Sequence, residues 1–122
     1  MLEVLFGSKN AERVLQFLLA RNNAYAREIA LFYDVSPSVI KNQLEKFEIG
    51  NIIVGRDIGN IRVYELNQRN PFINELTALL LKARTTYEPE DRARLVRKDR
   101  TRPRSKNKPL IQRRDNIQDM QK

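Results

Sequence analysis

The residues with the clearest chemical potential carry a hydroxyl, an ammonium group and a carboxamide: Ser38, Lys41 and Asn42. If residues 36–49 form a helix with Ile40 inward, its turn of about 100° per residue points Ser38 and Asn42 outward and places Lys41 on the flank. A carboxamide can pair bidentately with adenine, an ammonium group can reach guanine or a phosphate, and a hydroxyl can do either. This spacing therefore predicts contacts with base edges in the major groove of DNA.

Other cationic and hydroxyl side chains nearby could contact the sugar-phosphate backbone. Ser36 opens the same helix and Lys46 lies on its flank, while Arg27 falls early in the preceding helical segment. Arg56 and Arg62 flank a predicted hairpin, where they would meet phosphates or a minor groove. The predicted DNA-binding residues are therefore Arg27, Ser36, Ser38, Lys41, Asn42, Lys46, Arg56 and Arg62.

Each of these side chains also has a structural explanation, which the sequence leaves open. Ser36 is a good helix cap in any protein, because its hydroxyl can accept a hydrogen bond from a free backbone N–H. Lys41, Asn42 and Lys46 are side chains that any solvated helix surface carries, and the two hairpin arginines suit an ordinary strand surface. Their occurrence together, on one helix and the hairpin after it, favours DNA binding.

The chain of 122 residues contains no cysteine and no histidine. Disulfides, thiolate metal sites and cysteine nucleophiles are therefore excluded, and the commonest metal ligand and general base is missing. The repeated carboxylates Glu88, Glu90 and Asp91 are better explained by solvation, so we expect no enzyme, no cofactor and no bound metal. No apolar run has the length of a membrane span and no signal-peptide pattern opens the chain, which predicts a cytoplasmic protein.

The elements that must position these residues are indicated by periodicity and by capping signals. Apolar residues recur at helical spacing in four segments, and two further segments are β-rich. The predicted helices cover residues 9–21, 26–33, 36–49 and 72–84, and the predicted strands cover 52–57 and 61–66. Ser8 and Ser36-Pro37 are start signals for two of the helices, and Ile58-Gly59-Asn60 is a hairpin signal. The expected fold class is mainly α with a small β-hairpin.

Apolar positions predict which faces are buried. In the third helix the inward residues are expected to be Val39, Ile40, Leu44 and Phe47. Tyr64 is expected in the core rather than as a platform for stacking bases. The apolar positions between Leu76 and Leu81 are expected to pack on the first helix, and the spare ones could serve a homodimer.

The charge of the chain changes near Arg84, where we expect a domain boundary. Residues 1–84 carry 11 basic and 9 acidic side chains, and residues 85–122 carry 12 and 6. This composition predicts a basic tail that is partly helical, over 88–102, or disordered. Such a tail is either a phosphate-binding arm or a solubilising segment, and its one-signed charge favours the arm. The tail residues expected to contact phosphates are Arg97, Lys98, Arg100, Arg102 and Arg104.

Several short motifs resemble those of ArsR-like winged-helix regulators. They are Phe6-Gly7-Ser8-Lys9, Arg27-Glu28-Ile29-Ala30, Val35-Ser36-Pro37-Ser38-Val39-Ile40, Leu44-Glu45-Lys46-Phe47-Glu48 and residues 59–67. The resemblance covers about residues 5–80 and implies a winged helix-turn-helix fold and transcriptional regulation. Asn51 stands where the family usually has glycine, and asparagine also tolerates positive φ. The metal-sensing branch of the family uses cysteine and histidine, so metal sensing is not implied.

These observations together predict a small transcriptional regulator that binds duplex DNA sequence-specifically. Residues 36–49 would be the recognition helix in the major groove, and the hairpin over 52–67 would be the wing. The alternative is a winged-helix module that binds a separate catalytic or regulatory protein, since a fold does not by itself set a function. The basic outer face expected for residues 36–49 favours DNA over a protein partner.

Overall fold

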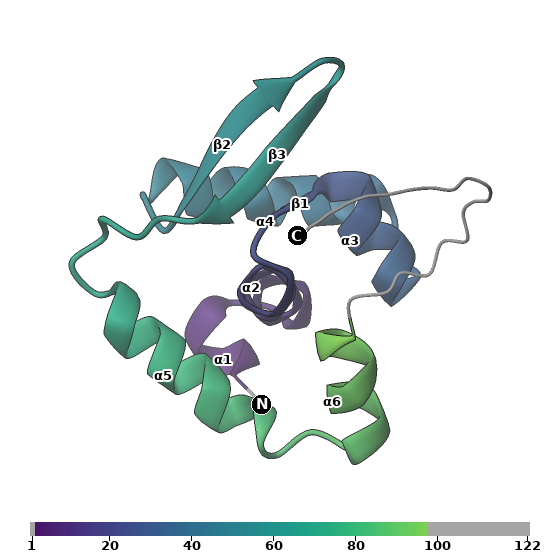
Figure 1. Cartoon of the computed structure of the whole chain (residues 1–122), viewed down its shortest axis with the longest axis vertical. Coiled ribbons are helices and arrows are strands. Elements are labelled where there is room, and N and C mark those ends of the chain that lie inside the picture. Colours follow the sequence, from purple (N-terminus) through teal and green to yellow (C-terminus); the bar gives the residue numbers. More distant parts are fainter. Residues whose placement is uncertain (1, 98–122) are drawn as a thin grey trace, which may run out of the picture.

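Helices pack around one central helix, and the hairpin of a small sheet projects at the top of the view (Figure 1). The computed structural model describes residues 2–97, so the predicted tail contacts Lys98, Arg100, Arg102 and Arg104 lie outside the described residues. The elements are α1 (Glu3–Phe6), α2 (Lys9–Arg21), β1 (Ala24–Tyr25), α3 (Ala26–Tyr33), α4 (Pro37–Ile49), β2 (Ile53–Ile58), β3 (Ile61–Leu66), α5 (Ile73–Arg84) and α6 (Pro89–Val96). Within these residues, no helix combines the length and the apolar content needed to cross a bilayer.

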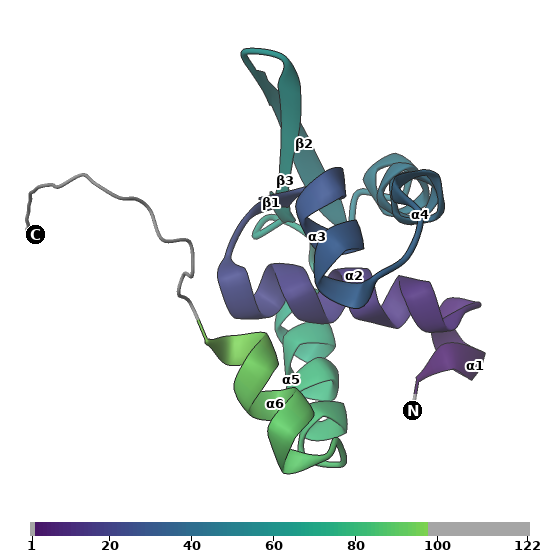
Figure 2. The same cartoon turned by 90° about the vertical axis from the view of Figure 1, so that its right-hand side faces the viewer.

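The central helix is α2, and every other layer packs on it. Figure 2 shows α3, α4 and the sheet on one side of α2, and α5 and α6 on the other. α2 begins at Lys9 as predicted, because the Ser8 side chain accepts a hydrogen bond from the Ala11 N–H. Its Leu15, Phe17 and other apolar side chains are fully buried. The core therefore surrounds α2 and extends from it in both directions.

The helix-turn-helix has the predicted bounds. α3 ends at Asp34, which adopts the left-handed conformation at φ 57°, and the partly buried Val35 packs against the core. Ser36 then caps α4 and Pro37 occupies its first position, where a missing N–H costs nothing. Ile40, Leu44 and Phe47 are buried, but the prediction for Val39 is wrong. Val39 is exposed, because the buried stripe of α4 follows spacings of four and three residues from Ile40 and does not include its neighbour.

The sheet has three strands, one more than the predicted hairpin. β3 pairs antiparallel with β2 on one side and with the two residues of β1 on the other, through Ala24 with Tyr64 and Tyr25 with Val63. The turn is shorter than expected, because the Ile58 residue pairs with Ile61 and only Gly59 and Asn60 are left to close the hairpin. Tyr64 is buried, as predicted. The three helices and the hairpin form a winged helix-turn-helix, which confirms the predicted fold class.

Packing continues across the boundary predicted at Arg84. α6 is shorter than the helix expected over 88–102, and its Leu95 is only 2% exposed, inside the main core. The Arg21 side chain of α2 donates to the backbone oxygens of Leu95 and Arg94, at 2.9 and 3.3 Å. The change in composition at Arg84 therefore does not mark the end of the packed chain, because one apolar side chain and these hydrogen bonds are enough to seat a short helix.

α5 is joined to α2 by a buried polar side chain. The predicted contact is present, since Ile73, Leu80 and Ala83 are buried. Gln16 of α2, which is 1% exposed, donates to the Leu80 oxygen at 2.7 Å and accepts from Arg84 Nε at 3.1 Å. A buried carboxamide is stable only when its donors and acceptor are satisfied. These two hydrogen bonds therefore fix how α5 lies along α2.

Candidate nucleic-acid interface

The outer side of α4 carries four of the predicted contact residues. Ser36, Ser38, Lys41 and Asn42 are all exposed. Ile40 and Leu44, both fully buried, fix the rotation of the helix and so determine which side faces outward. Within residues 2–97, the side chains of Lys41 and Asn42 take part in no hydrogen bond or ion pair. Their donors and acceptors are therefore available to a ligand.

Ser36 has the capping role that its sequence position predicts. Its hydroxyl accepts from the Ser38 N–H at 3.3 Å and lies 2.9 Å from the Ser38 hydroxyl. The two hydroxyls thus form a hydrogen-bonded pair at the amino-terminal end of α4, where the helix dipole is positive. Free N–H groups at a helix start are suited to a phosphate oxygen.

Replacing Ser36 tests its role as a helix cap. Ser36→Ala is expected to lower the free energy of unfolding by about 1 kcal/mol, because the Ser38 N–H loses its acceptor. Ser36→Asp keeps an acceptor and adds a favourable charge at the helix start, so its stability should equal that of the wild type. Urea unfolding of both variants measures this. An alanine variant of unchanged stability would show that the cap contributes nothing.

Lys46 points away from this row. Its ammonium group donates to the Phe6 backbone oxygen at 2.8 Å and lies 4.9 Å from the centre of the Phe47 ring. Phe6 in turn meets Phe47 edge to face, with ring centres 6.5 Å apart. Lys46 therefore joins α4 to the short helix α1, a four-residue element that the sequence did not predict. Its proposed DNA contact remains a prediction.

The two wing arginines are both paired with carboxylates. Arg56 and Glu65 lie on opposite strands, and their side chains meet at 2.8 Å on the outer side of the hairpin. Arg62 bonds Glu48 of α4 at 2.5 Å and Asp57 of β2 at 3.0 Å. The hydrogen bonds that Arg62 donates to these carboxylates, Glu48 first, raise its pKa. Sequence reasoning missed Glu48 as a partner, because nothing in its local pattern distinguishes it from a solvated side chain.

The remaining predicted contacts are exposed. Arg27 lies in the first turn of α3, and its side chain has no hydrogen bond or ion pair within residues 2–97. Arg97 follows the last residue of α6 and is likewise exposed. The two residues come from different elements and are not brought together with the α4 row by any contact in the described structure.

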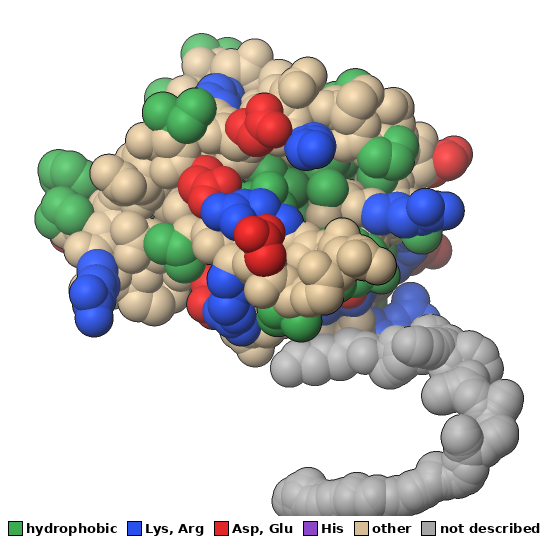
Figure 3. All heavy atoms as spheres, turned by 90° about the horizontal axis from the view of Figure 1, so that it is seen from above, with side chains coloured by type: hydrophobic (Ala, Val, Ile, Leu, Met, Phe, Trp, Pro, Cys, Tyr) green, Lys and Arg blue, Asp and Glu red, His purple; other side chains and the backbone are tan. Residues whose placement is uncertain are grey.

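The face that carries the wing is electrically mixed. Figure 3 shows basic and acidic side chains next to one another on this face, with no single basic patch. On α4 itself, Lys41 and Lys46 are offset by Glu45 and Glu48. The basic outer face expected for α4 is therefore not present. Residues 2–97 carry 14 basic and 12 acidic side chains, while residues 98–122 carry 9 and 3, so most of the net charge of +8 lies beyond Arg97.

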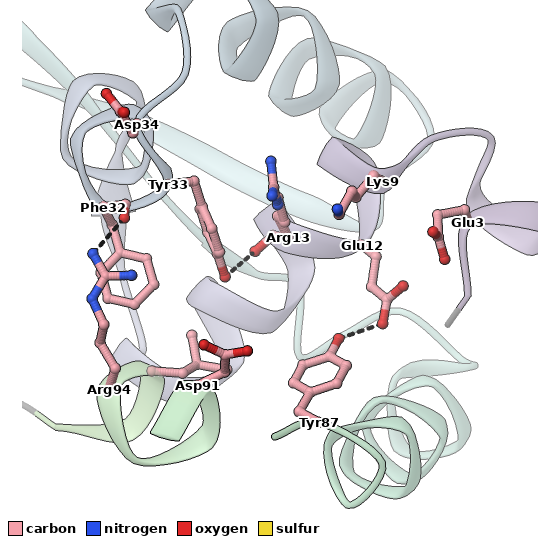
Figure 4. A pocket seen from close by; sticks show the side chains of 11 residues that line it. Glu3, Lys9, Glu12, Arg13, Phe32, Tyr33, Asp34, Tyr87, Asp91 and Arg94 are labelled. Carbon is pink, nitrogen blue, oxygen red and sulfur yellow. Dashed lines mark hydrogen bonds between the residues drawn. The ribbon is translucent and has the colours of Figure 1, made fainter. Parts of the chain in front are cut away.

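A cavity of about 460 Å³ lies between α2, α3 and α6, with no residue of α4 in its lining (Figure 4). Inside it the buried Glu12 accepts hydrogen bonds from the Tyr87 hydroxyl and the Leu2 N–H, and the Tyr33 hydroxyl donates to the Arg13 oxygen at 3.4 Å. Burial raises the pKa of both tyrosines. These hydrogen bonds join α2 to α3 and to the segment before α6 across the cavity.

In the part of the chain that the structure describes, no group of side chains is arranged to hold a metal ion. No three carboxylates lie close enough together there to hold an ion, and the whole sequence lacks cysteine and histidine.

Comparison with known proteins adds a likeness of fold. No family model matches the chain, and no relative is found among curated proteins. Similar solved structures include two of a mutant of Lactococcus lactis ZitR, one of them in apo form. The first is 16% identical to this chain and has a TM-score of 0.49, and the match covers 69% of this chain and 64% of that one. The apo form is 18% identical and also has a TM-score of 0.49, and the match covers 68% of this chain and 71% of that one. This chain therefore spans about two thirds of their length, and the resemblance to ArsR-like regulators remains a prediction.

Proposed function

We propose that this protein is a small transcriptional regulator that binds duplex DNA sequence-specifically, with α4 in the major groove. The observation that carries the proposal is the outer side of α4, where Lys41 and Asn42 are exposed and have no partner within residues 2–97. The buried Ile40 and Leu44 hold that side outward. An α-helix fits the major groove, and these side-chain types pair with base edges there.

The contacts divide into those that read bases and those that bind phosphates. Asn42, Lys41 and Ser38 are assigned to base edges, with Asn42 on an adenine. Ser36, Arg27 and Arg56 are assigned to phosphates, which fix position without reading sequence. The basic residues beyond Arg97 add an electrostatic attraction for any duplex.

Selection of bound fragments from random duplex DNA tests this proposal directly. We expect an enriched consensus, and a protein mass measured in the same buffer shows whether one or two copies bind. A palindromic consensus would indicate a homodimer, because the symmetry of a site mirrors that of the protein. Recovery of unenriched fragments alone would overturn sequence-specific binding.

Asn42→Ala tests the assignment of the base-reading side chain. We expect the ratio of affinities for the selected site and for random duplex to fall by about 1–3 kcal/mol, the value of one bidentate base contact. Asn74→Ala, the same change at an exposed position of α5, is the control and should leave the ratio unchanged. Fluorescence anisotropy with both duplexes measures the ratio. Equal ratios in wild type and in a folded Asn42→Ala variant would remove this residue from the base-reading set.

A protein-binding module is the second candidate, and the outer side of the wing favours it. Val54, Ile58 and Ile61 lie on the same side of the hairpin and are 41%, 49% and 43% exposed. Exposed β-branched side chains on a sheet suit an apolar partner better than a phosphate backbone. A purified chain that binds no duplex but co-purifies with one partner in defined ratio would favour this function.

A further inference from the structure

The guanidinium group of Arg62 joins three elements. It projects from β3, and it bonds Glu48 of α4 at 2.5 Å and Asp57 of β2 at 3.0 Å. Within residues 2–97, its bond to Glu48 is the one side-chain hydrogen bond that connects α4 with the strands of the hairpin. One positive charge here meets two negative ones, so this group has no excess charge to offer a phosphate.

Gly55 provides the space that this arrangement requires. It lies on β2 opposite Tyr64, on the same side of the hairpin as Arg62. A Cβ atom at this position would be 2.8 Å from Arg62 Nε and 3.0 Å from the Tyr64 ring. Because real Cβ atoms essentially never come that close, a side chain at Gly55 would displace the arginine from its path. The glycine and the two carboxylates thus specify one position for Arg62.

We propose that Arg62 is a positioning residue for DNA binding: it sets the angle between the wing and α4 and does not itself contact a phosphate. This inference rests on the proposed function, and it revises the expectation that Arg62 binds DNA. The wing and the recognition helix must fit two neighbouring parts of one duplex, and a fixed angle between them lowers the entropy cost of binding. The ion pair with Glu48 supplies that constraint from the side of the helix.

Glu48→Gln distinguishes positioning from phosphate contact by the sign of its effect. Removing a carboxylate beside DNA should strengthen binding if Arg62 is a phosphate contact, because repulsion falls and the arginine is released. If Arg62 positions the wing, the same change should weaken binding to the selected site by about threefold to tenfold, the size of a typical coupling between contacting residues. Tighter binding by Glu48→Gln therefore overturns the proposal.

The salt dependence of Arg62→Gln gives an independent readout. A lost phosphate contact lowers the slope of log affinity against log salt by about 0.9. If Arg62 has a positioning role, Arg62→Gln should bind DNA more weakly while the slope stays unchanged. The double variant with Glu48→Gln should then bind no more weakly than either single variant. Arg56→Gln is the matched control: its ion pair stays within the hairpin. Because the proposed function assigns Arg56 to a phosphate, the slope of this variant should fall by about 0.9. A slope lower by about 0.9 in Arg62→Gln would overturn the proposal.

Amide hydrogen exchange without DNA separates this inference from the proposed function. In the free full-length protein, exchange over residues 57–61 should be faster in Glu48→Gln and Arg62→Gln than in wild type or Arg56→Gln. Unchanged exchange in both variants would overturn the positioning role even if the protein binds DNA as proposed. A wild-type protein that binds no duplex would instead overturn the proposed function, whatever the exchange shows.

Discussion

Removal of residues 98–122 is expected to weaken binding to every duplex by a similar factor and to flatten its salt dependence. The deleted segment carries 9 basic and 3 acidic residues, most of the net charge of the chain. Phosphate contacts release counterions, so each one adds about 0.9 to the slope of log affinity against log salt. If the segment neutralises about four phosphates, the slope should fall by roughly 3 to 4 units.

The preference for the selected site over random DNA should survive this deletion. The proposed function assigns this preference to α4, and phosphate contacts position a protein without reading bases. The chain is cut after Arg97 because α6 packs on the core. Anisotropy titrations at several salt concentrations, with selected and random duplexes, give both quantities.

A charge-neutralised full-length variant is the control for the apolar residues that the deletion also removes. Replacing Arg100, Arg102 and Arg104 by glutamine leaves the length of the chain unchanged. Its slope should fall by about 2 to 3 units if these three residues contact phosphates. A deletion variant with an unchanged slope would make the segment a solubilising or protein-docking one, and the proposed arm would be wrong.

Leu95→Ala is expected to destabilise the whole fold by about 2–5 kcal/mol. Leu95 is 2% exposed and packs into the same core as the side chains of α2. Its helix is also held by Arg94, whose guanidinium donates to the Phe32 oxygen at 2.7 Å and lies 4.0 Å from the centre of the Phe32 ring. In a domain of this size, such a loss lowers the melting temperature by at least about 8 °C.

Val96→Ala, one position further along α6, is the control for this prediction. Val96 is 44% exposed, so its truncation should change the melting temperature little. Calorimetry of both variants should show one cooperative transition. If Leu95→Ala melts like the wild type, α6 is not part of the cooperative unit, and the boundary predicted at Arg84 describes the folded core correctly.

Local signals in the sequence predicted most elements, because each depends on a few adjacent residues. Ser8 and Ser36-Pro37 fixed two helix starts through capping. The missed elements depend on distant partners. β1 is two residues long and exists only because it pairs with β3, and α1 is held by Lys46, forty positions away. A periodic pattern cannot reveal contacts of this kind.

The outward row of α4 could be predicted for the same reason, whereas the role of the long cations could not. Helical period alone places Asn42 on the outer side and Lys41 on its flank. Lys46 and Arg62 have side chains long enough to reach several elements, so their partners depend on how those elements are arranged. In the folded protein they reach Phe6 and Glu48. The sequence therefore predicts which element carries a lysine or arginine, but not which part of the fold its charged group reaches.

The short strand β1 supports the wing at its base only. Ala24 and Tyr25 hold β3 at Tyr64 and Val63, next to the start of the helix-turn-helix. From Val63 to the tip at Gly59 the hairpin extends by roughly 13 Å without a third strand. Any bending of the hairpin is therefore expected beyond Val63, where the hydrogen bond from Arg62 to Glu48 joins β3 to α4. The base of the hairpin is paired on both sides of β3, whereas the tip depends on the pairing of β2 with β3 alone.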